Sequence, residues 1–349
     1  MVSDLTGLPV ANASMLDEPT SAAEAMSLLH RVDRSGSMRF VVDSDTQPQT
    51  LAVLRTRAEP LGIELDVRDV IAGLPEDGFF GVLVSVPTST GLVRDPAQLR
   101  ALADEVHARG GGLVVAADLL SLCLLTPPGQ WGADIVVGSA QRFGVPMGFG
   151  GPHAGVMAVR TGLERQLPGR LVGVSVDSAG KPAYRLALQT REQHIRRERA
   201  TSNICTAQVL LAVIAGLYGA YHGPDGLQRI AARVHGHAAQ LAAHLASDGV
   251  QVLHSAFFDT VVGVVPGRAR QVVTQAAELG VNLRLIDADH VGVSTDELTT
   301  TDHIDTVRTA FTGAVQDAGP GAPGGQRSSA GADVAALPEG WLRSTPFLE

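Results

Sequence analysis

The chain has 349 residues, of which 45% are hydrophobic and 18% charged, and its formal net charge at pH 7 is -9. This composition excludes global disorder, and the acidic balance argues against a nucleic-acid-binding protein, whose surface is usually basic. The length suits one large domain with a smaller one beside it.

Strand-like apolar runs alternate with helical patterns through the first half of the chain. The predicted strands are Arg39–Ser44, Ile63–Val67, Phe80–Val86, Leu113–Ala117, Asp134–Gly138 and Gly155–Val159. Helices are predicted over Gln49–Leu61 and Asp95–Arg109, the second with Asp95 as its cap and Pro96 in its first turn. Continuous apolar strands separated by helices predict a mostly parallel sheet covered on both faces.

After Cys205 the pattern indicates a compact α+β domain. The predicted helices are Thr206–Tyr221, Asp225–Ser247, Ala269–Leu279 and His303–Val315, and the predicted strands are Val250–His254, Thr260–Val265, Asn282–Ile286 and His290–Ser294. The segment Asp317–Asp333 is rich in Gly, Pro and Ser, which is typical of a linker. We therefore divide the chain into a large α/β domain (1–204), helices with a small α+β domain (205–316), and a linker with a tail (317–349).

The sequence favours a cytoplasmic protein. Its first 14 residues lack the basic and apolar regions of a secretory signal. The longest uncharged run, Ile204–Tyr221, contains polar residues and lacks interfacial anchors, so a buried helix is favoured over a membrane span. The two cysteines, Cys123 and Cys205, are too few for a disulfide framework or a zinc site.

Candidate functional residues follow the predicted strands, because ligands of open α/β sheets bind at the carboxyl ends of strands. Asp118 ends the strand Leu113–Ala117. A carboxylate there pairs with a buried cation or a protonated ring nitrogen, or simply caps a turn. Thr20 and Ser21 lie at a predicted helix start, which either binds phosphate or carries an ordinary cap. Ser139–Arg142 precedes a glycine-rich stretch that lacks the spacing of a nucleotide-binding loop.

The densest polar cluster is Arg185–Cys205. Its candidate pocket or partner-contacting residues are Arg191, His194, Arg197, Thr201 and Asn203. Arginine binds carboxylate or phosphate through two parallel hydrogen bonds. The segment is therefore either a solvated surface or part of a pocket. No histidine or cysteine pair has the spacing of metal ligands, so no metal site is predicted.

Several long segments resemble one protein family. They are Ser3–Met26, Gly138–Arg160, Ala187–Ala212, Asn282–Glu297 and the tail Leu342–Glu349. The chain is similar, from about Val2 to about Phe311, to the P-protein of the glycine cleavage system, the decarboxylating glycine dehydrogenase.

The resemblance implies the type I fold of pyridoxal-phosphate (PLP) enzymes, a doubly wound, mostly parallel α/β domain with a smaller C-terminal α+β domain. It implies PLP-dependent decarboxylation of glycine with transfer of the aminomethyl group to the lipoyl arm of the H-protein. PLP supplies the electron sink. The implied partners are a catalytic P-protein half and the lipoylated H-protein, with neither nucleic acid nor membrane.

The family is built from two homologous halves, and this chain resembles the N-terminal one, whereas the Schiff-base lysine belongs to the other half. Laying the glycine-rich turns on one another places Gln141 at the lysine position and Thr90 at the position of a ring-stacking histidine. Asp118 matches the aspartate that pairs with the pyridine nitrogen. Thr20 and Ser21 match the phosphate-binding helix start. The resemblance thus implies a cofactor pocket that has lost its nucleophile.

Among 27 basic residues the only lysine is Lys181. It is not expected to replace the missing nucleophile, because Asp177–Pro182 predicts an exposed turn and an exposed amine stays protonated at neutral pH. The chain is therefore expected to be inactive alone and to act with a catalytic half that holds PLP, contributing Arg191–Asn203 to the partner's PLP site. Compared with chains of the family, the sequence is expected to be a fragment that lacks the N-terminal arm and the second half.

Two alternative functions remain open at this stage. One is a structural pseudo-subunit without ligand. The other is a binder of a small anionic metabolite through Asp118, Thr20 and the arginine cluster.

Overall fold

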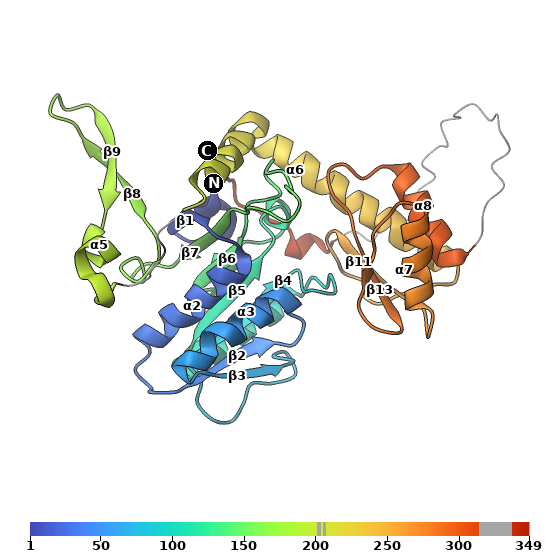
Figure 1. Cartoon of the computed structure of the whole chain (residues 1–349), viewed down its shortest axis with the longest axis horizontal. Helices are drawn as coiled ribbons and strands as arrows, with labels where there is room; N and C mark the ends of the chain where they lie inside the picture. Colours follow the sequence, from blue (N-terminus) through green and yellow to red (C-terminus); the bar gives the residue numbers. More distant parts are fainter. Residues whose placement is uncertain (201–203, 205–206, 314–336, 349) are drawn as a thin grey trace. The chain divides into compact units, whose positions relative to one another are not determined.

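The structure is a computed structural model that describes residues 1–200, 204, 207–313 and 337–348, arranged in two compact units (Figure 1). Unit 1 comprises Met1–Ser89, Arg94–Leu227 and Arg343–Glu349, and unit 2 comprises Thr90–Val93 and Gln228–Leu342. The division falls after Leu227, inside a helix, rather than at the predicted position 204/205. The predicted linker Asp317–Asp333 lies outside the described residues.

A seven-stranded sheet forms the centre of unit 1. Its strands are β1 (Val10–Met15), β2 (Arg39–Asp43), β3 (Glu64–Arg68), β4 (Gly81–Val86), β5 (Gly112–Ala117), β6 (Ile135–Ser139) and β7 (Gly155–Val159). Their order is β1-β7-β6-β5-β4-β2-β3, with β7 antiparallel to both neighbours and the pairs from β6 to β3 all parallel. The predicted mostly parallel, doubly wound sheet is confirmed.

Helices α2 (Glu18–Val32) and α3 (Pro48–Ala58) lie side by side on one face of this sheet (Figure 1). Their buried side chains share one core with alternate residues of the strands, such as Phe40, Leu83 and Val137. Because successive side chains of a strand point to opposite faces, the residues between these point to the other face of the sheet, against which α4 (Pro96–Ala108) packs. This burial on both faces explains the near-continuous apolar strands.

Helix α4 follows its sequence prediction closely. The Asp95 carboxylate accepts a 2.8 Å hydrogen bond from the amide of Ala97, and Pro96 is the first helical residue. Leu99, Leu102, Ala103 and Val106 are buried. The sequence analysis missed α1 (Val2–Thr6) and β1, which are short and weakly apolar, and placed the other strand ends within one or two residues.

A hairpin of β8 (Leu171–Val176) and β9 (Pro182–Ala187) was also missed. The two strands pair only with each other, with Val174 opposite Tyr184. The turn between them contains the segment Asp177–Lys181, closed by mutual hydrogen bonds of these two residues. A short helix, α5 (Gln193–Arg196), follows the hairpin.

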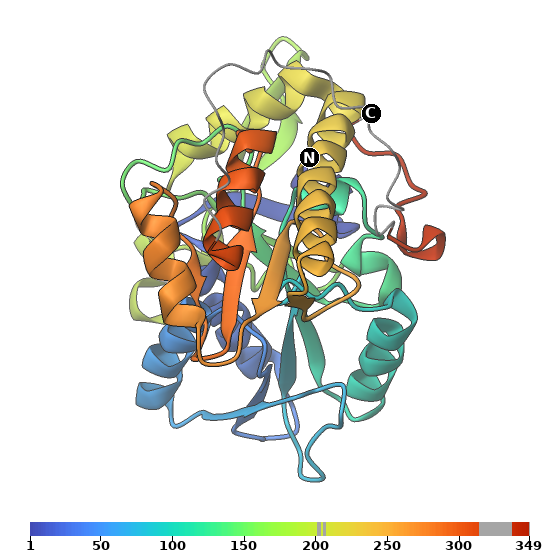
Figure 2. The same cartoon turned by 90° about the vertical axis from the view of Figure 1, so that its right-hand side faces the viewer.

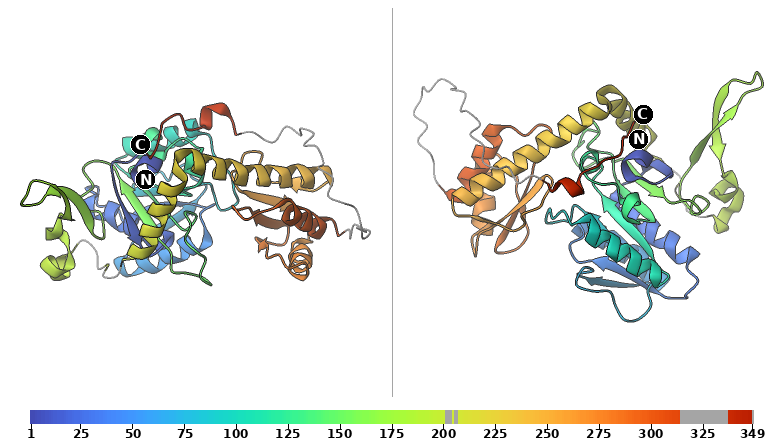
Figure 3. Two further views of the ribbon diagram at one scale, coloured as in Figure 1. Left: turned by 90° about the horizontal axis from the view of Figure 1, so that it is seen from above. Right: turned by 180° about the vertical axis from the view of Figure 1, so that it is seen from behind.

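Helix α6 (Val209–Ser247) begins in unit 1 and ends in unit 2. It bends at Gly223, whose φ of 62° and ψ of 178° are not helical, and which precedes Pro224 (Figure 3). The bend lies where the sequence predicts a break between two helices. In the second part the apolar residues spaced by three and four are all buried: Leu227, Ile230, Val234, Ala238, Leu241 and Leu245.

Unit 2 contains an antiparallel sheet in the order β10-β11-β13-β12. These strands are β10 (Gln251–Val252), β11 (Thr260–Val264), β12 (Arg284–Leu285) and β13 (His290–Ser294). Helices α7 (Ala269–Glu278) and α8 (Thr301–Thr312) join the end of α6 in one core against this sheet (Figure 2). The predicted α+β architecture is confirmed.

The C-terminal residues return to unit 1 through Arg343. Its guanidinium donates to the carbonyl oxygen of Leu122 at 2.8 Å and to that of Leu5 at 2.6 Å. Its backbone amide donates to the carbonyl oxygen of Leu124 at 2.7 Å. The end of the chain is thereby fixed beside α1. Over the described ranges, no helix is both long and apolar enough to cross a membrane.

Candidate functional site

The candidate site lies where the carboxyl ends of β5 and β6 meet the first turn of α2. Asp118 follows β5, while Gln141 and Arg142 follow β6. Glu18 begins α2, and its carboxyl is close enough to Asp118 for the two charges to interact. The rule for open α/β sheets selects Asp118 and Gln141 as candidates, whereas the sequence analysis gave no role to Arg142 or Glu18.

Each oxygen of the Asp118 carboxylate accepts a hydrogen bond from this chain's own groups. Arg142 Nη1 lies 2.6 Å from Asp118 Oδ2, and the side chains of both residues are 19% exposed. The other oxygen accepts a 2.9 Å hydrogen bond from the amide of Leu120. The position that the resemblance assigns to a protonated ring nitrogen is therefore taken by a permanent guanidinium charge.

The first turn of α2 is capped by Asp17. Its Oδ1 accepts a 2.8 Å hydrogen bond from the amide of Thr20, and its carbonyl oxygen accepts from both the amide and the hydroxyl of Ser21. These are the groups that the resemblance assigns to a phosphate. This helix start is thus an ordinary cap, and Asp17 places its negative charge at the N-terminus of α2.

Glu18 adds a second carboxyl to this turn. Burial and, to a smaller extent, the negative charge of Asp118 raise its pKa to about 7, against the opposing effect of the Thr50 hydroxyl, which lies 3.4 Å from Glu18 Oε1. The group thus titrates near neutral pH. No signal in the sequence indicated this, because the shift depends on neighbours from three separate segments.

The residues present do not fit PLP. Gln141 supplies no amine, and its side-chain amide donates to the carbonyl oxygen of Val145 at 3.1 Å. Arg142 forms an ion pair with Oδ2 of Asp118, the residue that the resemblance assigns to the ring nitrogen of PLP. A phosphate at the start of α2 would meet Asp17 and Glu18, both acidic, at the place where it needs donors. No catalytic step through this group is therefore derived for this chain.

Two further residues of the sequence analysis lie elsewhere. The hydroxyl of Thr90, which belongs to unit 2, lies 2.8 Å from His254 Nε2. Lys181 is exposed in the hairpin turn, as predicted. Cys123 is buried, and burial raises the pKa of its thiol to about 12, so it is not a reactive thiolate at neutral pH.

The predicted pocket segment after β9 is only partly described. His194 Nδ1 lies 3.5 Å from Glu192 Oε2, which also approaches Arg170 Nε at 3.6 Å. Arg197 is exposed and has a positive φ of 54°. Arg191 lies in a short 3-10 turn. Thr201, Asn203 and Cys205 lie outside the described residues.

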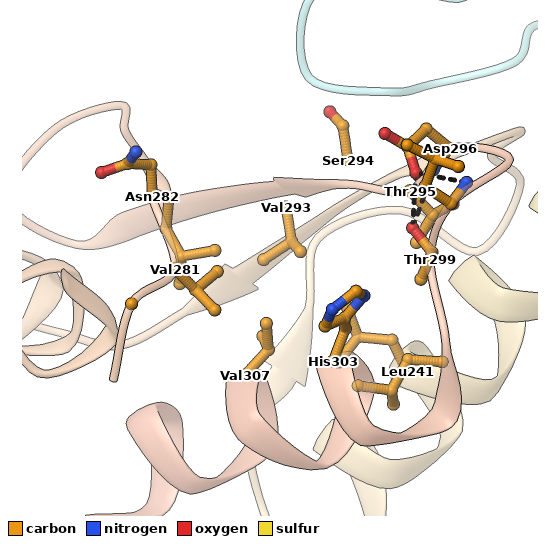
Figure 4. Close-up of a pocket in the computed structure, with 14 residues that line it drawn as sticks. Leu241, Val281, Asn282, Val293, Ser294, Thr295, Asp296, Thr299, His303 and Val307 are labelled. Carbon is orange, nitrogen blue, oxygen red and sulfur yellow. Dashed lines mark hydrogen bonds between the residues drawn. The ribbon is translucent and has the colours of Figure 1, made fainter. Parts of the chain in front are cut away.

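Unit 2 contains a cavity of about 300 Å³ between β13 and α8 (Figure 4). Its floor is apolar, with Leu241, Val293 and Val307, and its rim carries the polar side chains of Asp296 and His303. Within the described part of the chain no three His, Cys, Asp or Glu side chains gather in a metal-binding arrangement.

A family model described as the glycine cleavage system P-protein matches residues 1–311. Among solved structures, an inhibitor-bound glycine decarboxylase (P-protein) of the glycine cleavage system matches with a TM-score of 0.83 and 37% identity, covering 90% of this chain and 73% of that one.

More distant structures share the fold. A lysine-to-alanine variant of C-DES, with glycine covalently linked to its PLP cofactor, matches with a TM-score of 0.61 and 14% identity, covering 89% of this chain and 83% of that one. Leishmania major threonine aldolase matches at 0.58 and 15%, covering 88% and 86%. At these identities the likeness shows the PLP-enzyme type I fold alone.

Proposed function

Because this chain belongs to the glycine cleavage system P-protein family, as its N-terminal half, we propose that it serves glycine decarboxylation only together with a homologous half that carries the Schiff-base lysine. In this proposal the partner half holds PLP, and the complex passes the aminomethyl group of glycine to the lipoyl arm of the H-protein. PLP supplies the electron sink there. The compartment we propose is the cytoplasm.

The ion pair of Arg142 and Asp118 is the observation that carries this proposal. With Nη1 and Oδ2 2.6 Å apart and the other oxygen bonded to the amide of Leu120, a cofactor ring would compete for Asp118 with a guanidinium that is already in place. Gln141, at the position of the missing lysine, adds no nucleophile. This half therefore supplies surface and structure to the complex, and the reacting atoms belong to the partner.

The hairpin supports a large partner surface. Opposed residues of an antiparallel pair point to the same side, so Val172, Val174, Val176 and Tyr184 share one face. They are 65%, 77%, 67% and 82% exposed. An isolated two-stranded sheet is marginally stable in water, and a continuous apolar face of this kind marks an interaction surface.

Charge supports the same assignment. Residues 170–199 contain seven basic and three acidic residues, a net charge of +4 in a chain whose total is -9. A basic segment around an apolar face fits a partner whose own surface is apolar at the centre and acidic at the rim. We assign that partner as the lysine-bearing half.

The cofactor assignment is tested on the chain alone. After incubation with PLP and borohydride reduction, mass spectrometry is expected to find no stoichiometric pyridoxyl adduct. A Gln141→Lys variant is expected to give the same result, because Arg142 still pairs with Asp118. A full adduct on Lys181, or on the introduced lysine, would overturn the proposal.

The pairing is tested by mixing the chain with the lysine-bearing half. Analytical ultracentrifugation is expected to show a complex, and glycine–bicarbonate exchange is expected to appear only in the mixture. Val174→Asp is expected to weaken the complex at least tenfold, whereas the control Leu279→Asp, at a 48% exposed residue of unit 2, leaves it unchanged. His194→Ala is expected to lower exchange without loss of folding. Equal binding by both aspartate variants would exclude the hairpin as the partner surface.

A further inference from the structure

A second cavity in unit 1, of about 290 Å³, is lined by four arginines. Arg31 comes from the last turn of α2, Arg165 follows β7, and Arg196 and Arg199 follow the hairpin. The remaining lining residues are Gln166, Leu188, Thr190 and Ala200. Since Asp118 faces the first turn of α2 and Arg31 lies in its last turn, this cavity is separate from the site described above.

Few of the guanidinium donors facing this cavity have a described acceptor. Arg31 Nη2 donates to the carbonyl oxygen of Gln166, and Arg196 Nε donates to that of Thr190, both at 3.2 Å. Each guanidinium carries five N–H donors. Among the residues that the structure describes, the other N–H donors of these two side chains have no acceptor, which leaves them available to solvent or to a ligand.

The positive charges are only partly balanced by nearby carboxylates. None of the described residues lining the cavity is acidic. Two carboxyls close by interact electrostatically with these arginines, but each has another partner: Glu24 accepts a hydrogen bond from Arg57 at 2.8 Å, and Glu164 accepts one from the amide of Gly162 at 2.7 Å. All four arginines are exposed, so solvent screens part of their mutual repulsion, and an anion lying between them would offset more of it.

We propose that this cavity binds a compact small-molecule anion that carries two phosphate or carboxylate groups. Paired N–H donors of arginine match both groups geometrically, and more than one negative charge is needed to offset four positive ones. The volume is near the lower end of the range for organic ligands, about 300–1,000 Å³, so two such groups on a short frame fit it better than a dinucleotide does. Leu188 and Ala200 provide a small apolar wall for that frame.

This inference goes beyond the proposed function, because the site needs neither PLP nor glycine. Arg31 and Arg165 lie outside the hairpin and outside Arg191–Asn203. Their substitution therefore tests the anion site without altering the surface assigned to the partner half.

Isothermal titration calorimetry of the full chain, with inorganic pyrophosphate and with succinate as probes, tests the proposal. Sodium chloride at matched ionic strength is the reference. Saturable one-to-one binding of either probe is expected. Pyrophosphate alone would assign the ligand to phosphates, and succinate alone to carboxylates. Arg31→Ala and Arg165→Ala are each expected to raise Kd about 10- to 100-fold, and Arg165→Lys, which keeps only the charge, less.

The matched control is Arg229→Ala, at an exposed arginine of α6 in unit 2. It is expected to leave Kd unchanged, and thermal unfolding checks that every variant is folded. The proposal fails if neither probe binds beyond the salt reference. It also fails if Arg31→Ala and Arg165→Ala bind as tightly as the unmodified chain, or if Arg229→Ala weakens binding equally.

Discussion

Replacing Glu18 by Gln is expected to stabilise the chain at alkaline pH and to change little at acidic pH. Burial is the main reason that the pKa of this carboxyl rises from its usual 4.5 to about 7 in the folded chain. The folded state therefore holds the proton more tightly than the unfolded state. Stability contributed by the neutral acid is present below pH 4.5 and is lost as pH rises through about 7.

The size of the effect follows from the same values. A rise from 4.5 to about 7 corresponds to about 3 kcal/mol, at about 1.36 kcal/mol for each pH unit. Because the side chain is partly exposed, this is an upper value. Glutamine stays neutral at every pH, so Glu18→Gln should gain up to about 3 kcal/mol at pH 8 and almost nothing at pH 4.5.

Urea unfolding of both proteins at pH 4.5, 6 and 8 measures this difference. Glu76→Gln, at an exposed loop glutamate, is the matched control and should show no pH-dependent gain. A gain for Glu18→Gln that is the same at all three pH values would refute the electrostatic reasoning. A loss at pH 8 would show that the ionised carboxylate stabilises the first turn of α2.

Two other predictions concern packing inside the units. Arg94 and Asp43 form an ion pair at 2.6 Å, with side chains only 8% and 1% exposed. Arg94→Met should therefore lower the free energy of unfolding by about 3–5 kcal/mol, and Asp43→Leu added to it should restore most of that loss. A urea series that shows no restoration would contradict this. Gly138→Ala should lower Tm because its methyl group would overlap the carbonyl oxygen of Ala117, whereas Gly236→Ala, with open space around it in α6, should raise stability by about 0.5–1 kcal/mol. Equal Tm changes for the two alanine variants would contradict the second prediction.

Much of the fold could be predicted from the sequence because its signals are local. The apolar runs that became β4, β5 and β6 are short and separated from one another by helical or turn segments, which favours strands. The cap of α4 and the bend at Gly223 are also set by neighbouring residues. The hairpin was missed although β8 alternates as a half-buried strand does, and the sequence does not show that its apolar side faces solvent.

The candidate site could be located but not described. Asp118 was found because it ends a strand, yet its partner Arg142 comes from another strand, and only packing decides that the two meet. The same holds for the arginine cavity. Its walls come from three segments that sequence periodicity does not connect, so the density of arginines after β9 indicated a charged segment without its partners Arg31 and Arg165.

The return of Arg343 to α1 has a consequence for how the chain is made. On the ribosome, the carbonyl oxygens of Leu5 and Leu122 are synthesised long before the guanidinium that binds them. All of Gln228–Leu342, which forms most of unit 2, is translated in between. Unit 1 therefore gains these hydrogen bonds only after unit 2 has been synthesised, and a nascent chain stopped before Arg343 would carry the larger unit without them.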